Sequence, residues 1–111
     1  MEEINKERPF ILLEESEQKT ITEAIKIFGK ERQILKLSEE AAELSAASSR
    51  FLNSRTDEDL SALLGEIADV QIMIYQFIEI SNACPFPIND TIENKIKRLG
   101  EYNQKEKERQ A

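Results

Sequence analysis

Apolar residues recur at spacings of three and four along most of the chain, which is the pattern of amphipathic α-helices. Helices are predicted at about 20–28, 30–52, 57–81 and 90–100. The apolar stripe of the second predicted helix consists of Ile34, Leu37, Ala41, Leu44, Ser48 and Phe51. The third carries Leu60, Leu63, Leu64, Ile67, Val70, Ile74, Phe77 and Ile78. So broad an apolar face predicts that the third helix is the most buried.

Helix boundaries are marked by short polar motifs. Thr20 and Glu23 have the spacing of a capping box at the start of the first helix, and Gly29 supplies its stop. Residues 53–56 form a short polar link before the third helix, with Thr56 and Asp59 as a possible cap. A link this short makes the second and third helices antiparallel neighbours.

The last helix follows a break. Pro85 and Pro87 exclude a helix interior there, and Asp90 begins the fourth helix in a sequence with a second capping-box spacing. Beyond Gly100 the chain is rich in Lys, Glu and Gln, and we expect it to fray. The domain organisation predicted is an arm or short helix at 1–19, an all-α domain at 20–102 and a charged tail at 103–111.

Composition and charge narrow the function. A net charge of −7 argues against nucleic acid as a partner, because binding its backbone needs a basic surface. The chain contains no His, which excludes His-based triads and most zinc sites, and its one Cys, Cys84, forms no intrachain disulfide. No signal-peptide pattern and no apolar run of membrane-spanning length is apparent, so no membrane association and a cytoplasmic location are expected.

Two pairs of acids lie three residues apart inside the second and third helices: Glu40 with Glu43, and Glu66 with Asp69. Acids are frequent enough (22 of 111 residues) that such pairs arise by chance. These two pairs differ from the others because they border apolar stripes, where like charges repel and partial burial disfavours ionisation. In the second helix the acids share a flanking row with Gln33, Lys36 and Ala47.

Geometry brings the two pairs together. At 100° per residue, both acidic rows lie to the same rotational side of their apolar stripes, and an antiparallel pair keeps such rows on one face. Glu43 should lie level with Glu66, and Glu40 level with Asp69. Four carboxylates at one level need a cation or protonation, and oxygen ligands select Mg²⁺, with Mn²⁺ or Ca²⁺ as alternatives. A solvated acidic flank without metal stays open at this point.

At these residues the sequence resembles the MazG-like, all-α nucleoside triphosphate pyrophosphohydrolases, which carry an E-x-x-E motif on one helix and E-x-x-D on the next. The motifs read Glu40-Ala-Ala-Glu43 and Glu66-Ile-Ala-Asp69 here. Residues 28–33 look like the family's lead-in to its first acidic helix, and residues 94–99 resemble its C-terminal basic helix. The similarity spans about residues 20–102.

The resemblance implies Mg²⁺-dependent hydrolysis of a (deoxy)nucleoside triphosphate to the monophosphate and pyrophosphate, in nucleotide-pool cleaning or control. The four acids would hold the metal. Glu39 is a candidate for orienting or deprotonating the attacking water, although a solvated glutamate is an equal alternative. Lys95 and Arg98 are candidate phosphate ligands or an exposed basic flank, and Gln33 is a candidate contact to the base or sugar.

The expected architecture is a four-helix, bundle-type protomer built on the central hairpin. Its broad apolar face predicts completion by a copy of itself, and the resemblance implies a homodimer or homotetramer. Two other functions stay open: a non-catalytic helical interaction module, and an enzyme like the phosphoribosyl-ATP pyrophosphatases.

Overall fold

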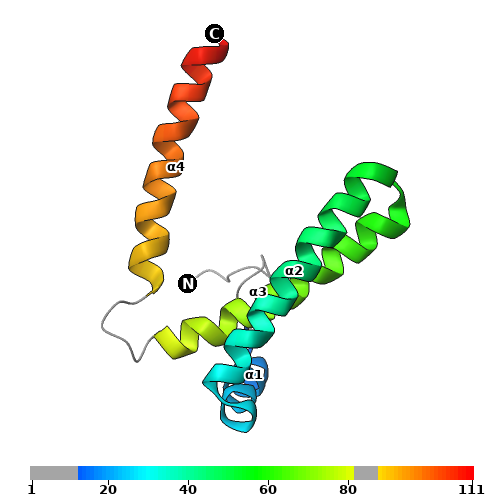
Figure 1. The fold of residues 1–111 in the computed structure, drawn as a ribbon. Coiled ribbons are helices and arrows are strands. Elements are labelled where there is room, and N and C mark those ends of the chain that lie inside the picture. The colour runs from blue at the N-terminus through cyan, green and yellow to red at the C-terminus, as the bar shows by residue number, and fades with distance from the viewer. Residues whose placement is uncertain (1–12, 82–87) are drawn as a thin grey trace. The chain divides into compact units, whose positions relative to one another are not determined.

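A computed structural model describes residues 13–81 and 88–111, and all regular structure in those residues is α-helical. The four helices are α1 (Glu15–Phe28), α2 (Lys30–Ser54), α3 (Asp57–Ser81) and α4 (Ile88–Gln110) (Figure 1). The chain divides into two compact units, residues 1–73 and 74–111, with the boundary inside α3. The predicted all-α fold is confirmed. Residues 1–12, and the break at Pro85 and Pro87, lie outside the described residues.

The first helix begins five residues before the predicted start. Glu14 is its N-cap, and the Glu14 backbone N–H donates to the Glu17 carboxylate at 2.9 Å, as in a capping box. Thr20 lies inside the helix, where its hydroxyl donates to the Ser16 carbonyl at 3.1 Å. The predicted cap at Thr20 and the observed cap at Glu14 are each followed three residues later by a Glu. No Gly or Pro separates the two positions, so the helix begins at the earlier one.

Gly29 forms the corner between α1 and α2, as predicted. Its φ of 86° lies in the region that a side chain disfavours, and its backbone N–H donates to the Ile25 carbonyl at 2.9 Å. The Gly29 carbonyl in turn accepts from the Gln33 N–H at 3.2 Å, which starts the hydrogen-bond ladder of α2. One residue therefore ends one helix, starts the next and lets α1 pack on α2.

The α2–α3 connection is only Arg55 and Thr56, shorter than the four-residue link predicted. Arg55 ends α2 in the left-handed conformation, with φ of 57°, and its N–H donates to the Phe51 carbonyl at 2.8 Å. The Thr56 hydroxyl accepts from the Asp59 backbone N–H at 3.2 Å, which confirms the predicted cap. The two helices run antiparallel and pack closely, as predicted (Figure 1).

The contact surface between α2 and α3, here called the seam, is not formed by the apolar stripe of α2. It is formed by the row of residues that was expected to flank that stripe. In α2 the buried residues are Gln33, Glu40 and Ala47, whereas Ile34 of the predicted core stripe is 52% exposed. In α3, Met73 lies seven residues after Glu66, on nearly the same face of the helix, and is only 4% exposed. The prediction that the stripes form the core is therefore wrong for much of the hairpin.

The apolar stripe of α3 is largely exposed over its first half. Leu60, Leu64 and Ile67, spaced as one helix face, are each more than one third accessible. The third helix was predicted to be the most buried, and it does have the largest share of residues that are not exposed among the described helices, but most of these lie in its second half. The physical reason is that a pair of helices can bury only the seam between them, so a face pointing away needs a further partner.

α3 is the one helix among the described residues that is long and apolar enough, by length and composition, to cross a membrane. The expectation that no segment reaches this threshold is therefore wrong for α3. Glu66 and Asp69 lie near the middle of the helix, and ionisable side chains at the centre of a bilayer are costly.

α4 continues through Gly100 to Gln110, so the expected fraying beyond Gly100 does not occur. Side chains one turn apart support its last turns. Arg109 forms an ion pair with Glu106, and the Gln104 amide donates to the Glu108 carboxylate at 3.2 Å. Such pairs each stabilise a helix slightly and together offset the cost of the single Gly.

Replacement of the cap of α3 should destabilise the hairpin. Thr56→Ala removes the acceptor for the Asp59 N–H and should lower the free energy of unfolding by about 1 kcal/mol, measured by urea denaturation. Thr20→Ala is the matched control, because that hydroxyl bonds within the interior of α1 and Ala is a better helix former. Equal losses in the two variants would contradict a capping role for Thr56.

Candidate functional site

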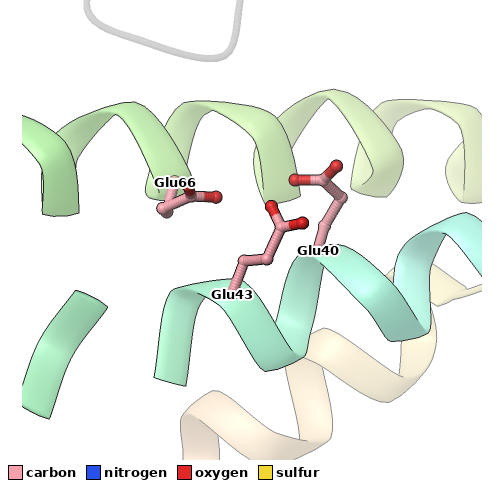
Figure 2. A group of neighbouring side chains, drawn as sticks. All are labelled: Glu40, Glu43 and Glu66. Atoms are coloured by element: carbon pink, nitrogen blue, oxygen red, sulfur yellow. The ribbon is translucent and has the colours of Figure 1, made fainter. Parts of the chain in front are cut away.

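Three carboxylates from two helices meet in the seam of the hairpin. Glu40 and Glu43 extend from α2, and Glu66 extends from α3 toward them (Figure 2). Glu43 lies eleven residues before Ser54, the last residue of α2, and Glu66 lies nine residues after Asp57, the first residue of α3, so the short connection brings the two acids to similar levels. The predicted convergence of Glu43 with Glu66 at one level of the hairpin is therefore present in the structure.

The three groups are close and partly withdrawn from water. One oxygen of each lies within 4.8 Å of the others. Glu40 is only 6% exposed, Glu66 is half-buried and Glu43 is exposed. The Oε2 atoms of Glu40 and Glu66 are buried and have no hydrogen-bond partner. Buried carboxylate oxygens normally have partners, so these two are available for a ligand.

The electrostatics of the seam disfavour three ionised carboxylates. Partial burial raises the pKa of Glu66 above 4.5, and the negative charges of Glu43, Asp69 and Glu40 raise it further. A hydrogen bond with Glu43 acts in the same direction, because it requires a proton on one of the two groups. Either a proton or a cation must offset this concentration of negative charge.

One positive charge already contacts the group. Lys36 Nζ lies 3.2 Å from Glu40 Oε1, one helical turn earlier on α2. The hydrogen bond to Glu40 and its charge raise the pKa of Lys36 above 10.5, so the ammonium is ionised at neutral pH. Lys36 was not among the predicted site residues, although its i,i+4 spacing from a partly buried acid is the sequence signal for such a pair.

Two other predicted acids lie beside the group. Asp69 is exposed, and its carboxylate is not among the three that meet, but its charge contributes to the raised pKa of Glu66. A role for Asp69 in metal binding stays a prediction. Glu39 is exposed and contributes to the raised pKa of Lys36, so its negative charge acts near the group.

The predicted substrate contacts lie on different elements. Gln33, on the same row of α2 as Glu40, is 6% exposed, so most of its side chain is taken up within the fold. Lys95 and Arg98 are exposed on α4 and line a hollow of its surface together with Tyr102 and Lys105. α4 belongs to the second unit, and its basic face is therefore a feature of that unit by itself.

The donor set fits a hard divalent cation. All three grouped side chains offer carboxylate oxygens, which are the ligands that Mg²⁺, Mn²⁺ and Ca²⁺ prefer. The partnerless Oε2 atoms of Glu40 and Glu66 supply free lone pairs from opposite sides of the seam. A cation bound there would replace the proton that the raised pKa of Glu66 favours.

The raised pKa of Glu66 predicts a pH dependence of stability without metal. A carboxyl whose pKa is raised on folding contributes stability below its unfolded pKa, near 4.5, and loses it as pH rises through the folded value. Glu66→Gln does not ionise. The free energy of unfolding of this variant, measured in EDTA, should therefore gain on the wild type as pH increases from 4 to 7.

Glu23→Gln controls for the loss of one exposed negative charge, since Glu23 lies on α1 outside the group. A constant difference between Glu66→Gln and the wild type over this pH range would contradict electrostatic strain at Glu66.

Comparison with models of known protein families, with curated proteins and with solved structures finds no match to this chain. Overall sequence similarity therefore contributes nothing to the assignment of a function. The arguments that remain are the short acidic motifs and the geometry of the carboxylates in the α2–α3 seam.

Proposed function

We propose that the protein hydrolyses a nucleoside or deoxynucleoside triphosphate to the monophosphate and pyrophosphate, with a divalent cation held by acids of the α2–α3 hairpin. Glu40, Glu43 and Glu66 form the binding group, and Asp69 completes it. The observation that carries the proposal is the partly buried carboxylate cluster with two partnerless oxygens. The E-x-x-E and E-x-x-D motifs supply the reaction type by resemblance.

The proposed cation is Mg²⁺, with Mn²⁺ as a substitute. The sequence has no His, and the grouped ligands are all carboxylates, which selects against zinc and copper. Mg²⁺ bound by a few carboxylates keeps several water molecules and completes its coordination with substrate phosphates. The protein carries a net charge of −7, so a polyphosphate substrate needs such a cation between itself and the acids.

The chemistry proposed is attack of water on the α-phosphorus, with pyrophosphate as the leaving group. A bound divalent cation supplies charge neutralisation at the phosphate oxygens and lowers the pKa of water. Glu39, exposed beside the binding group, is the proposed residue that orients the water or accepts its proton. Lys95 and Arg98 of α4 are the proposed ligands of the phosphate chain.

We also propose that the protein is a homo-oligomer in which a second copy covers the apolar side of the hairpin. Ile34 and Ala41 lie about 100–120° around α2 from Glu40. Ile67 and Leu60 lie about 100–120° around α3 from Glu66 in the same rotational sense.

In an antiparallel pair, equal offsets of this kind fall on one face of the hairpin. The result is a continuous apolar surface that runs along both helices, and its members are accessible in the isolated chain. A contiguous apolar face of this kind marks an interaction site. Two-fold pairing of the face with itself is the simplest way to bury it.

The enzymatic proposal is tested by measuring pyrophosphate release with a panel of canonical and modified nucleotides in the presence of Mg²⁺. Wild-type protein should release pyrophosphate from at least one of them. Glu40→Gln and Glu43→Gln should each lower the rate about 100-fold or more, because even residues behind metal ligands affect activity 10- to 100-fold.

Glu23→Gln, with the same chemical change on α1, should keep the wild-type rate. Circular dichroism shows whether each variant retains its helices. No release from any nucleotide by the folded wild type would overturn the enzyme assignment and favour a non-catalytic interaction module.

The oligomer is tested by two adjacent substitutions on α2. Ile34→Glu places a charge on the apolar side of the hairpin and should dissociate the oligomer, because an unpaired charge in an apolar interface is costly. Leu35→Glu is the control, since Leu35 is 67% exposed and points about 140° from Glu40 in the other direction. Light scattering after size exclusion gives the mass of each. A monomeric wild type, or identical behaviour of the two variants, would contradict this interface.

A further inference from the structure

The ion pair between Lys36 and Glu40 lies within the proposed metal site. Lys36 Nζ is 3.2 Å from Glu40 Oε1, and the other oxygen of the same carboxylate, Oε2, is buried without a partner. Glu40 therefore presents one oxygen to an ammonium and one to the seam. One oxygen of this carboxylate binds the Lys36 ammonium, and the other is free to bind a cation from solution.

The two partners of this ion pair differ in their freedom to move. The Glu40 side chain is 9% exposed, whereas the Lys36 side chain is 52% exposed. Lysine carries its charge on a flexible four-carbon stem, which can turn toward water without disturbing the fold. Any rearrangement on cation binding therefore falls on Lys36, and Glu40 stays in place.

The charges around Lys36 explain why it occupies this position. Glu40 forms the ion pair with it, and Glu39 and Glu43 lie next to Glu40 along α2 and add negative charge nearby. Without a bound cation, Lys36 is thus the compensating charge for a cluster in which oxygens of Glu40, Glu43 and Glu66 lie within 4.8 Å of one another. With a divalent cation in the seam, the same ammonium lies close to a like charge.

We infer that Lys36 is a built-in counter-cation of the proposed metal site, which stabilises the metal-free hairpin and lowers its affinity for divalent cations by competing for Glu40. This inference rests on the metal site of the proposed function. It adds a regulatory property to that site, because the strength of cation binding is set by a residue that is not itself a ligand. The cluster is kept from binding a cation too tightly, while its metal-free form stays folded.

The inference predicts opposite effects of one substitution on two measurements. Lys36→Met removes the charge and keeps an unbranched side chain of similar length. Its affinity for Mn²⁺, measured by electron paramagnetic resonance of the free ion, should increase about tenfold, since a like charge a few ångströms away costs about that factor even at high dielectric. Its melting temperature in EDTA should fall below that of the wild type, because the cluster loses its counter-ion.

Two further variants make the test specific. Lys36→Arg keeps a cation and should retain the wild-type Mn²⁺ affinity and melting temperature. Lys19→Met removes an exposed lysine of α1 and controls for the change in net charge. A gain in affinity confined to Lys36→Met, together with its loss of metal-free stability, would support the inference.

These measurements distinguish failure of the role of Lys36 from failure of the proposed metal site. If wild type and Lys36→Met bind Mn²⁺ equally, the site exists but Lys36 does not compete for it, and the inference is overturned. If neither protein binds Mn²⁺ while both are folded, the metal site itself is absent and the proposed function fails with it. An equal gain in Lys19→Met would reduce the effect to overall charge, which also overturns the inference.

Discussion

Repulsion among carboxylates across the α2–α3 seam is the constraint on which the rest of the site depends. Glu40 is held by burial, and Glu66 approaches it from the opposite helix, so neither can escape the other by moving into water. The hairpin tolerates this arrangement because Lys36 offsets part of the charge and Glu66 favours protonation. Both devices reduce the net negative charge of the carboxylate group in the metal-free chain.

The two sides of the hairpin have different character. One side carries Lys36 and the exposed Glu43 of the carboxylate group. The other side carries Ile34 on α2 and Leu60, Leu64 and Ile67 on α3. Burial of that apolar side by a second copy would fix the helices rigidly while leaving the acidic side open. The apolar face would then stabilise the oligomer, and the opposite face of the same hairpin would carry the proposed binding site.

Much of the fold could be predicted from the sequence, because its signals are local. Gly29 ends a helix through its own backbone freedom, and Thr56 caps the next through its own hydroxyl. The start of α1 was misplaced because Glu14 and Thr20 both begin a stretch with the same cap spacing, and the apolar periodicity that was used to place the helix begins only at Ile21. The extension of α4 beyond Gly100 was missed because a single Gly is a weak stop inside a helix with several supporting side-chain pairs.

The site could be predicted only in part, for a different reason. That Glu43 and Glu66 lie near one level of the hairpin could be predicted, because any short connection makes the two helices antiparallel neighbours. The sequence does not show which row of α2 faces α3. Periodicity identifies an apolar stripe but not the partner that covers it. The sequence was therefore interpreted with Ile34 inside and Glu40 on a flank, whereas the chain by itself buries Glu40 and exposes Ile34.

The two-residue connection at Arg55 and Thr56 has a consequence for how this protein can change. Surface turns normally accept inserted residues, because their length matters little to the elements that they join. Here the lengths of helix on either side of the turn bring Glu43 close to Glu66. One residue added inside α3 between the turn and Glu66 would rotate Glu66 by about 100° relative to the helix start and carry it out of the seam. The stretches of helix between the turn and the carboxylates are thus less permissive to insertion than the exposed turn itself.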